Sequence, residues 1–166
     1  MTVTDISKDR TARTLTLTAE YPAQPEHVWQ LWADPRLLER WWGPPTHPAT
    51  VLEHDLRPGG RVTYFMTSPE GEKYHGYWTI HEVDAPRGLA FEDGFADGEG
   101  AANDALPTSQ SKVAIAAVDA GTTRMTITAI FPSEEAMDQL IQMGMEEGLR
   151  LAVGQTDDLL RQRVSS

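Results

Sequence analysis

The stretch DPRLLERWWGPP, residues 34–45, decides how the first part of the chain folds. Asp34 and Pro35 stand in the order of an N-cap residue followed by a first-turn proline, a position where the missing proline N–H loses no hydrogen bond. Apolar residues then recur at helical spacing, at Leu37, Leu38, Trp41 and Trp42. Residues 43–45, Gly-Pro-Pro, end the pattern because they do not continue a helix. The stretch therefore predicts a short amphipathic helix, and a similar one before it, starting at Pro25, presents Val28, Trp29, Leu31 and Trp32.

A longer helical signal begins at Ser133 and runs to about Arg161. Ser133 is the predicted N-cap, because the acidic residues Glu134 and Glu135 follow it in the first turn. At about 1.5 Å per residue this helix would be roughly 40 Å long, enough to cross a whole sheet. Its apolar line follows the 3.6-residue period through Met137, Leu140, Ile141, Gly144, Gly148, Ala152, Val153 and Leu159.

The rest of the chain reads as strands separated by turns rich in glycine and proline. Strands are predicted at 13–21, 49–56, 61–67, 73–83, 89–95, 111–118 and 123–131. Strands joined by short turns pair antiparallel, because parallel pairing needs a long crossover. One helix is long enough to cover such a sheet. The predicted fold class is α+β, a curved antiparallel sheet around a long C-terminal helix with two short helices after the first strand.

Several motifs resemble one known family: PRLLERWWGP at 35–44, DLRPGG at 55–60, DAPRGL at 84–89 and MGMEEG at 143–148. The chain is similar, over about residues 13–161, to the family named after the activator of the heat-shock-protein-ninety ATPase. That family lies within the SRPBCC group, which includes START domains and the birch-pollen-allergen fold. The resemblance implies a single SRPBCC-type domain over 1–166 with a helix-grip fold. It also implies a cavity between sheet and long helix that holds a hydrophobic ligand or presents a surface to a partner, and no universal catalytic set.

The predicted cavity residues are large apolar side chains on the elements that would surround that cavity. Trp41 and Trp42 end the second short helix, and Trp78 shares its side of a strand with Tyr74 and Ile80. Aromatic side chains in such places stack on flat ligands, but they are also ordinary core residues. The full set of cavity candidates is Trp41, Trp42, Tyr64, Met66, Trp78, Phe91, Phe95, Met137, Ile141, Gly144 and Gly148.

The two glycines of this set lie on one side of the predicted long helix. A glycine inside a helix costs about 1 kcal/mol relative to alanine, so something should compensate for Gly144 and Gly148. Two explanations stay open: close packing of the helix on the sheet, or space left for a bound molecule. Among the carboxylates, Glu92, Asp93 or Glu147 would have a raised pKa if it faced the cavity, and would be a solvated surface group otherwise.

Composition excludes several classes of function. The formal net charge of −11 argues against nucleic acid and anionic lipid as partners. With 0 cysteines there is no thiolate nucleophile or cysteine-ligated zinc. His75 and His81 lie roughly 20 Å apart along one strand, too far to share an ion. No metal, cofactor, membrane span or signal peptide is predicted, and the cytoplasm is the expected location.

Three functions remain as hypotheses. The first is binding of a small hydrophobic ligand without defined catalysis. The second is a co-chaperone-like interaction protein with a chaperone as partner, and the third is a polyketide cyclase-like enzyme. The enzyme requires at least two titratable groups that converge inside the cavity. A homodimer formed through a sheet edge or the short helices is compatible with the sequence.

Overall fold

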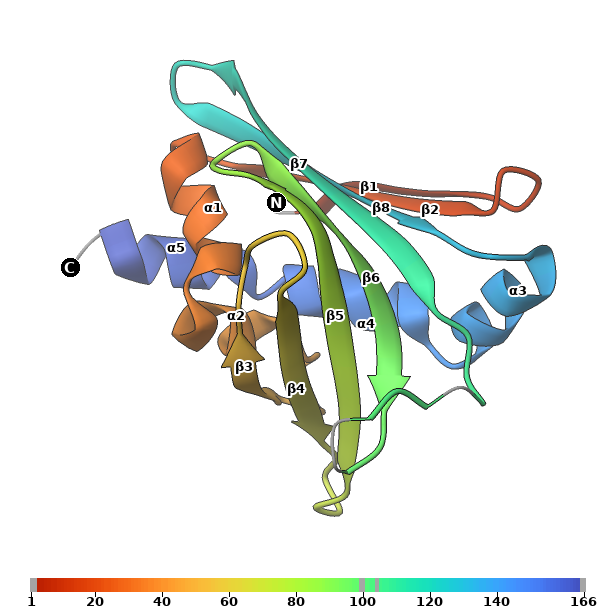
Figure 1. Ribbon diagram of the computed structural model, residues 1–166. Helices are drawn as coiled ribbons and strands as arrows, with labels where there is room; N and C mark the ends of the chain where they lie inside the picture. Colours follow the sequence, from red (N-terminus) through yellow and green to blue (C-terminus); the bar gives the residue numbers. More distant parts are fainter. Residues whose placement is uncertain (1–2, 99–100, 104, 165–166) are drawn as a thin grey trace.

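One antiparallel sheet of eight strands, in the order β1-β2-β8-β7-β6-β5-β4-β3, forms the centre of the molecule. The computed structural model describes residues 3–98, 101–103 and 105–164. Figure 1 shows the sheet curving around the helices of the C-terminal segment. The strands are β1 (Val3–Asp9), β2 (Thr14–Tyr21), β3 (Ala49–His54), β4 (Arg61–Thr67), β5 (Lys73–Asp84), β6 (Gly88–Ala96), β7 (Ser109–Asp119) and β8 (Thr122–Ile130). The predicted α+β helix-grip fold is confirmed.

The strand register separates an inner and an outer side of the sheet. Trp78 on β5 lies opposite Val62 on β4 and Asp93 on β6, so these three side chains share the inner side. Every strand predicted from the sequence is present within two residues of its predicted limits. The edge strand β1 was not predicted, because its sequence VTDISKD has a mostly exposed, polar pattern.

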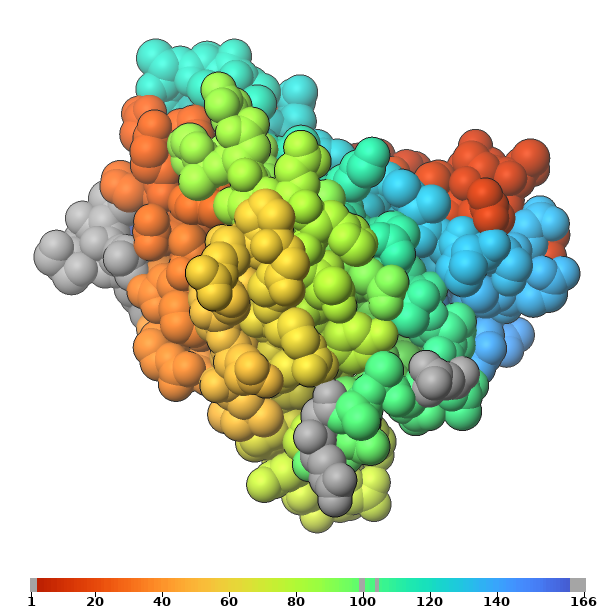
Figure 2. Space-filling view, in the orientation of Figure 1, coloured from red at the N-terminus to blue at the C-terminus, as the bar shows by residue number. Residues whose placement is uncertain are grey.

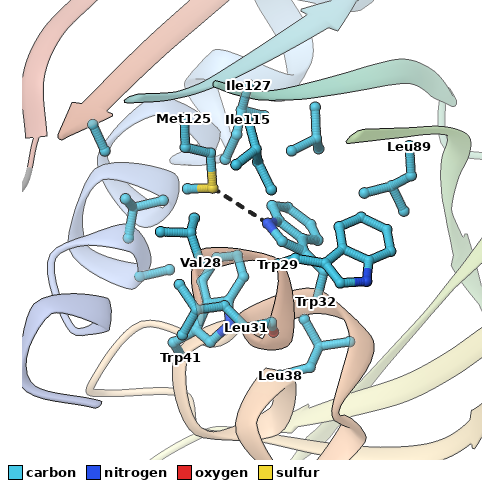
Figure 3. Packing of buried hydrophobic residues seen from close by; sticks show 14 of the residues in the cluster. Val28, Trp29, Leu31, Trp32, Leu38, Trp41, Leu89, Ile115, Met125 and Ile127 are labelled. Atoms are coloured by element: carbon cyan, nitrogen blue, oxygen red, sulfur yellow. Dashed lines mark hydrogen bonds between the residues drawn. The ribbon is translucent and has the colours of Figure 1, made fainter. Parts of the chain in front are cut away.

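Two short helices close one end of the sheet, α1 (Pro25–Ala33) and α2 (Pro35–Trp41). Asp34 is the N-cap of α2, and its side chain accepts a hydrogen bond from the Arg36 backbone N–H. Figure 3 shows apolar side chains of both helices packed against the sheet residues Ile115, Met125 and Ile127. Both predicted helices are therefore confirmed, and their tryptophans are part of the core.

The C-terminal segment consists of three consecutive helices, α3 (Glu134–Gln142), α4 (Met145–Val153) and α5 (Thr156–Val164). Figure 1 shows them one after another along the inner side of the sheet. The structure differs here from the single helix expected over 133–161. The first interruption lies at Gly144, whose φ of 96° is left-handed, and the second follows Gly154. Within the described ranges, no helix combines the length and apolarity that a membrane crossing requires.

The last helix is fastened to the sheet by a buried polar contact. The hydroxyl groups of Tyr21 on β2 and Thr156 on α5 share a hydrogen bond of 2.8 Å. The Thr156 hydroxyl also donates to the Val153 carbonyl oxygen at 2.6 Å, at the turn between α4 and α5. Both side chains are buried, so this contact fixes where the helical segment restarts.

Candidate functional site

An open groove of about 710 Å³ lies at the end of the sheet where β4 and β6 finish and β5 begins. Figure 2 shows this edge, where the yellow-green end of the β4–β5 hairpin lies against the green segment that follows β6. The space falls in the range of about 300–1,000 Å³ that is usual for small-molecule sites. Its lining residues are His47, Met66, Lys73, Tyr74, His75, Phe95, Ala96, Asp97, Gly98, Asn103, Leu106 and Met143.

Seven of the eleven predicted cavity residues fall into three groups by position. Met66 and Phe95 line the groove. Trp41, Trp78 and Phe91 are fully buried and pack in the main core. The third group consists of Met137 and Ile141, which line a separate surface notch of about 360 Å³ beside Lys8 and Arg10.

The two glycines prove to be different from one another. Gly144 is exposed and adopts the left-handed conformation that separates α3 from α4. Gly148 lies inside α4, one helical turn from the buried Ala152. A Cβ added at Gly148 would meet no atom within 4 Å. Close packing against the sheet therefore does not account for Gly148, and open space does.

Aromatic rings connect the core to the inner end of the groove. Trp78 stacks on Phe91 with ring centroids 4.1 Å apart, and Trp42 meets Trp78 edge-on at 4.8 Å. Trp42 also approaches Tyr64 edge-on at 6.2 Å. Tyr64 and Met66 are two residues apart on β4, as are Asp93 and Phe95 on β6, so each pair shares the inner side. Tyr64 and Asp93 thus lie about 7 Å deeper along their strands than the groove-lining residues.

Asp93 is an acidic residue on the apolar inner side of the sheet. The Tyr64 hydroxyl donates a hydrogen bond to its carboxylate at 3.3 Å. Burial raises the pKa of Asp93 to about 7, and the hydrogen bond from Tyr64 opposes only part of that rise. Burial, followed by the charge of Asp93, raises the pKa of Tyr64 well above its ordinary value. The site therefore holds a carboxyl group that changes protonation near neutral pH.

Two indole N–H groups lie beside this pair without a hydrogen-bond partner. Among the described residues, the Nε1 atoms of Trp42 and Trp78 are buried and unsatisfied. Both indoles are close enough to the Tyr64 oxygen to favour its ionised form, though burial dominates. Among the described residues, neither indole N–H thus forms a hydrogen bond of normal geometry, although the Tyr64 oxygen lies nearby.

Comparison with models of protein families shows the family to which the chain belongs. Residues 22–161 match the model of the Activator of Hsp90 ATPase homolog 1-like protein family. The chain belongs to this family. The resemblance in the motifs at 35–44 and 143–148 is confirmed, since both lie inside the matched region. A chaperone as partner stays a prediction.

Solved structures of bacterial proteins support the family assignment. The crystal structure of protein Ms6760 from Mycobacterium smegmatis is 51% identical, has a TM-score of 0.87, and the match covers 95% of this chain and 96% of that one. An NMR structure of a protein from Arthrobacter aurescens is 45% identical, has a TM-score of 0.92, and covers 97% and 93% of the two chains. DynU16, from the dynemicin biosynthetic locus, is 17% identical with a TM-score of 0.59 over 85% of this chain and 46% of its own, which shows the fold alone. No curated protein matches the chain.

The candidate carboxylates lie on different sides of the sheet or on the surface. Asp93 faces inward, whereas Glu92 faces outward and accepts a hydrogen bond from the Tyr77 hydroxyl at 3.1 Å. Glu147 is exposed and forms an ion pair with Arg150. The sequence does indicate the side on which Asp93 lies, because Phe91, Asp93 and Phe95 are two residues apart on β6 and therefore share one side of the strand. Leu106 and Met143 reach the groove through tertiary folding, and no local pattern indicates their role.

Proposed function

We propose that the protein binds a small, mostly hydrophobic molecule in the groove between the inner side of β4–β6 and the α3–α4 junction. The observation that carries the proposal is that Met66 and Phe95 face inward by register yet are only partly buried and line an unfilled space. Leu106 and Met143 add apolar surface from the loop after β6 and from the helical junction. Membership of the Activator of Hsp90 ATPase homolog 1-like protein family supports the same conclusion, because the resemblance to that family implies a cavity.

The test uses a neutral hydrophobic fluorophore, N-phenyl-1-naphthylamine, because an anionic dye would be repelled by the acidic chain. Phe95→Ser removes a ring from the groove and should weaken binding at least about tenfold, since a buried ring contributes well over 1.4 kcal/mol. Phe65→Ser is the matched control, because Phe65 is also partly buried but lies on the outer side of the sheet. No binding to the wild type, or equal losses in both variants, would reject the groove as the site.

Acid–base catalysis is a second candidate, favoured by the convergence of Asp93 and Tyr64. The Asp93 carboxylate would take a proton from the carbon beside a ligand carbonyl, while the nearby N–H and O–H donors stabilise the negative oxygen that forms. The assay is exchange of the α-hydrogens of 2-tetralone in deuterated water, followed by NMR. Exchange should be faster than in buffer alone and lost in Asp93→Asn. A bound ketone that exchanges no faster than free ketone would reject catalysis and leave ligand binding intact.

A further inference from the structure

We propose that Trp42, Tyr64, Trp78 and Asp93 form the polar end of this site and select a hydrophobic ligand that carries a neutral hydroxyl group. The inference rests on the proposed function and specifies its ligand class. These four side chains are named below as the polar end.

Four elements bring the polar end together. Trp42 caps the C-terminus of α2, Tyr64 lies on β4, and Asp93 lies on β6. The strand between them, β5, supplies Trp78, which pairs directly with Asp93. Gly76 on β5 pairs with Tyr64, and a Cβ there would overlap the Tyr64 hydroxyl. The lack of a side chain at Gly76 therefore lets the phenol cross β5 and reach the Asp93 carboxylate.

The other buried tryptophans show that unpaired indoles are not the rule in this core. Trp32 Nε1 donates to the Met125 sulfur at 3.2 Å (Figure 3), and Trp41 Nε1 donates to the Leu31 carbonyl oxygen at 2.9 Å. Both side chains are fully buried, and both have their donors satisfied. Buried indole N–H groups usually find a partner, because an unsatisfied one costs stability.

Trp42 and Trp78 are the exceptions within the described residues, and both contact Tyr64, which lies two residues along β4 from the groove-lining Met66. A core that satisfies its structural tryptophans but leaves these two unpaired retains hydrogen-bonding capacity about 7 Å along the strands from the groove lining. That capacity points to an acceptor atom brought by a ligand.

The donors and acceptors of the polar end fit a hydroxyl better than other groups. A hydroxyl oxygen accepts from the indole N–H groups, and its hydrogen is donated to the Asp93 carboxylate, which has acceptor sites beyond the one that Tyr64 uses. An ether or ketone oxygen would accept hydrogen bonds from the indole N–H groups but has no hydrogen to donate to the Asp93 carboxylate. A carboxylate would place a second negative charge beside Asp93 in a poorly hydrated site.

The charge state of Asp93 makes this selection depend on pH. With a pKa of about 7 caused mainly by burial, Asp93 is an acceptor above neutral pH and a donor below it. Tyr64 is the titratable group that contacts it, and His47, Lys73, His75 and Asp97 line the mouth of the groove. On α4, Glu146 pairs with Lys8 and Glu147 pairs with Arg150. Discrimination between a hydroxyl and a carboxylate should therefore be strongest above pH 7.

The experiment compares 2-naphthol, 2-methoxynaphthalene and 2-naphthoate, which share one ring system, by isothermal titration calorimetry at pH 8. The wild type should bind the naphthol about tenfold more tightly than the methyl ether, the value of one charge-assisted hydrogen bond. Asp93→Asn should reduce that ratio to about twofold or less. Trp78→Phe should weaken both compounds, because both place an oxygen against the indole N–H. Lowering the pH to 6 should improve binding of the naphthoate relative to the naphthol.

Tyr77→Phe is the matched control, because it removes a phenol hydroxyl from the same sheet on the outer side, and it should leave all ratios unchanged. If Asp93→Asn does not fold, Tyr64→Phe replaces it and should likewise lower the ratio. Equal binding of the naphthol and its methyl ether by the wild type would overturn hydroxyl selection and leave the proposed function standing. Binding of neither neutral compound would overturn both.

Discussion

Gly144 and Gly148 should respond in opposite directions to the same substitution. At Gly144 φ is 96°, a conformation that costs a residue with a Cβ roughly 1–2 kcal/mol. Gly144→Ala should therefore lower the free energy of unfolding by about that amount. Gly148 lies within α4, where an added Cβ meets no atom within 4 Å. Gly148→Ala should raise the free energy of unfolding by about 0.5–1 kcal/mol, because alanine loses less conformational entropy in a helix.

The assay is urea unfolding followed by circular dichroism at 222 nm, with the slope fitted for each variant. With a slope of about 2 kcal/mol/M, the two midpoints should move apart by about 1 M in total. An unchanged slope would show that the variants differ in stability rather than in the extent of unfolding. If both variants were stabilised, α3 and α4 would behave as one continuous helix and the assigned interruption would be refuted. If Gly148→Ala were destabilising, the space beside it would be filled.

The remaining predictions concern buried polar groups. Tyr21→Phe should lower the free energy of unfolding by about 1–2 kcal/mol in thermal or urea unfolding, because the Thr156 hydroxyl loses its hydrogen bond to Tyr21 and keeps only the one to Val153; no loss would show that the contact is dispensable. Gly76→Ala should cost more than about 2 kcal/mol, because its Cβ overlaps the Tyr64 ring, and the near-ultraviolet spectrum should change; an unchanged spectrum would contradict this. Asp93 has a folded pKa of about 7, above its unfolded value of about 3.9, so its contribution is complete below pH 4 and is lost as the pH rises to 7. Relative to Asp93→Asn, the wild type should lose up to about 1.4 kcal/mol per pH unit in that interval, and parallel pH profiles would refute the burial of Asp93.

The sequence contains most of the fold because the local signals agree with one another. The Asp34-Pro35 start and the tryptophan spacing specify α2, and turn residues bound each strand from β3 to β8. Two features of the fold, β1 and the break at Gly144, could not be predicted from the sequence, for physical reasons. β1 depends on pairing with β2 rather than on its own apolar pattern, and the break at Gly144 depends on a backbone angle that hydrophobic periodicity does not report.

The candidate site is less visible in the sequence than the fold. The alternation of β6 places Asp93 with Phe91 and Phe95, but the same alternation does not say which side of the strand is buried. The register with β5 decides it, since Asp93 lies opposite Trp78. The mouth of the groove combines residues from β4, β5, the loop after β6 and the α3–α4 junction, so it depends on tertiary structure.

The acidity of the chain and the acidity of the polar end act over different distances. The net charge of −11 is spread over the surface of the protein. At physiological salt, exposed charges more than about 8 Å from a ligand are largely screened from it. Lys73 and two histidines also line the groove mouth, so the local field there is not simply that of the whole protein. Asp93 is partly buried on the inner side of the sheet, and partly buried charges are screened less than exposed ones. Discrimination against anionic ligands should therefore come from Asp93 rather than from the net charge, and one partly buried carboxyl group would then determine both the ligand's polarity and the pH at which that preference changes.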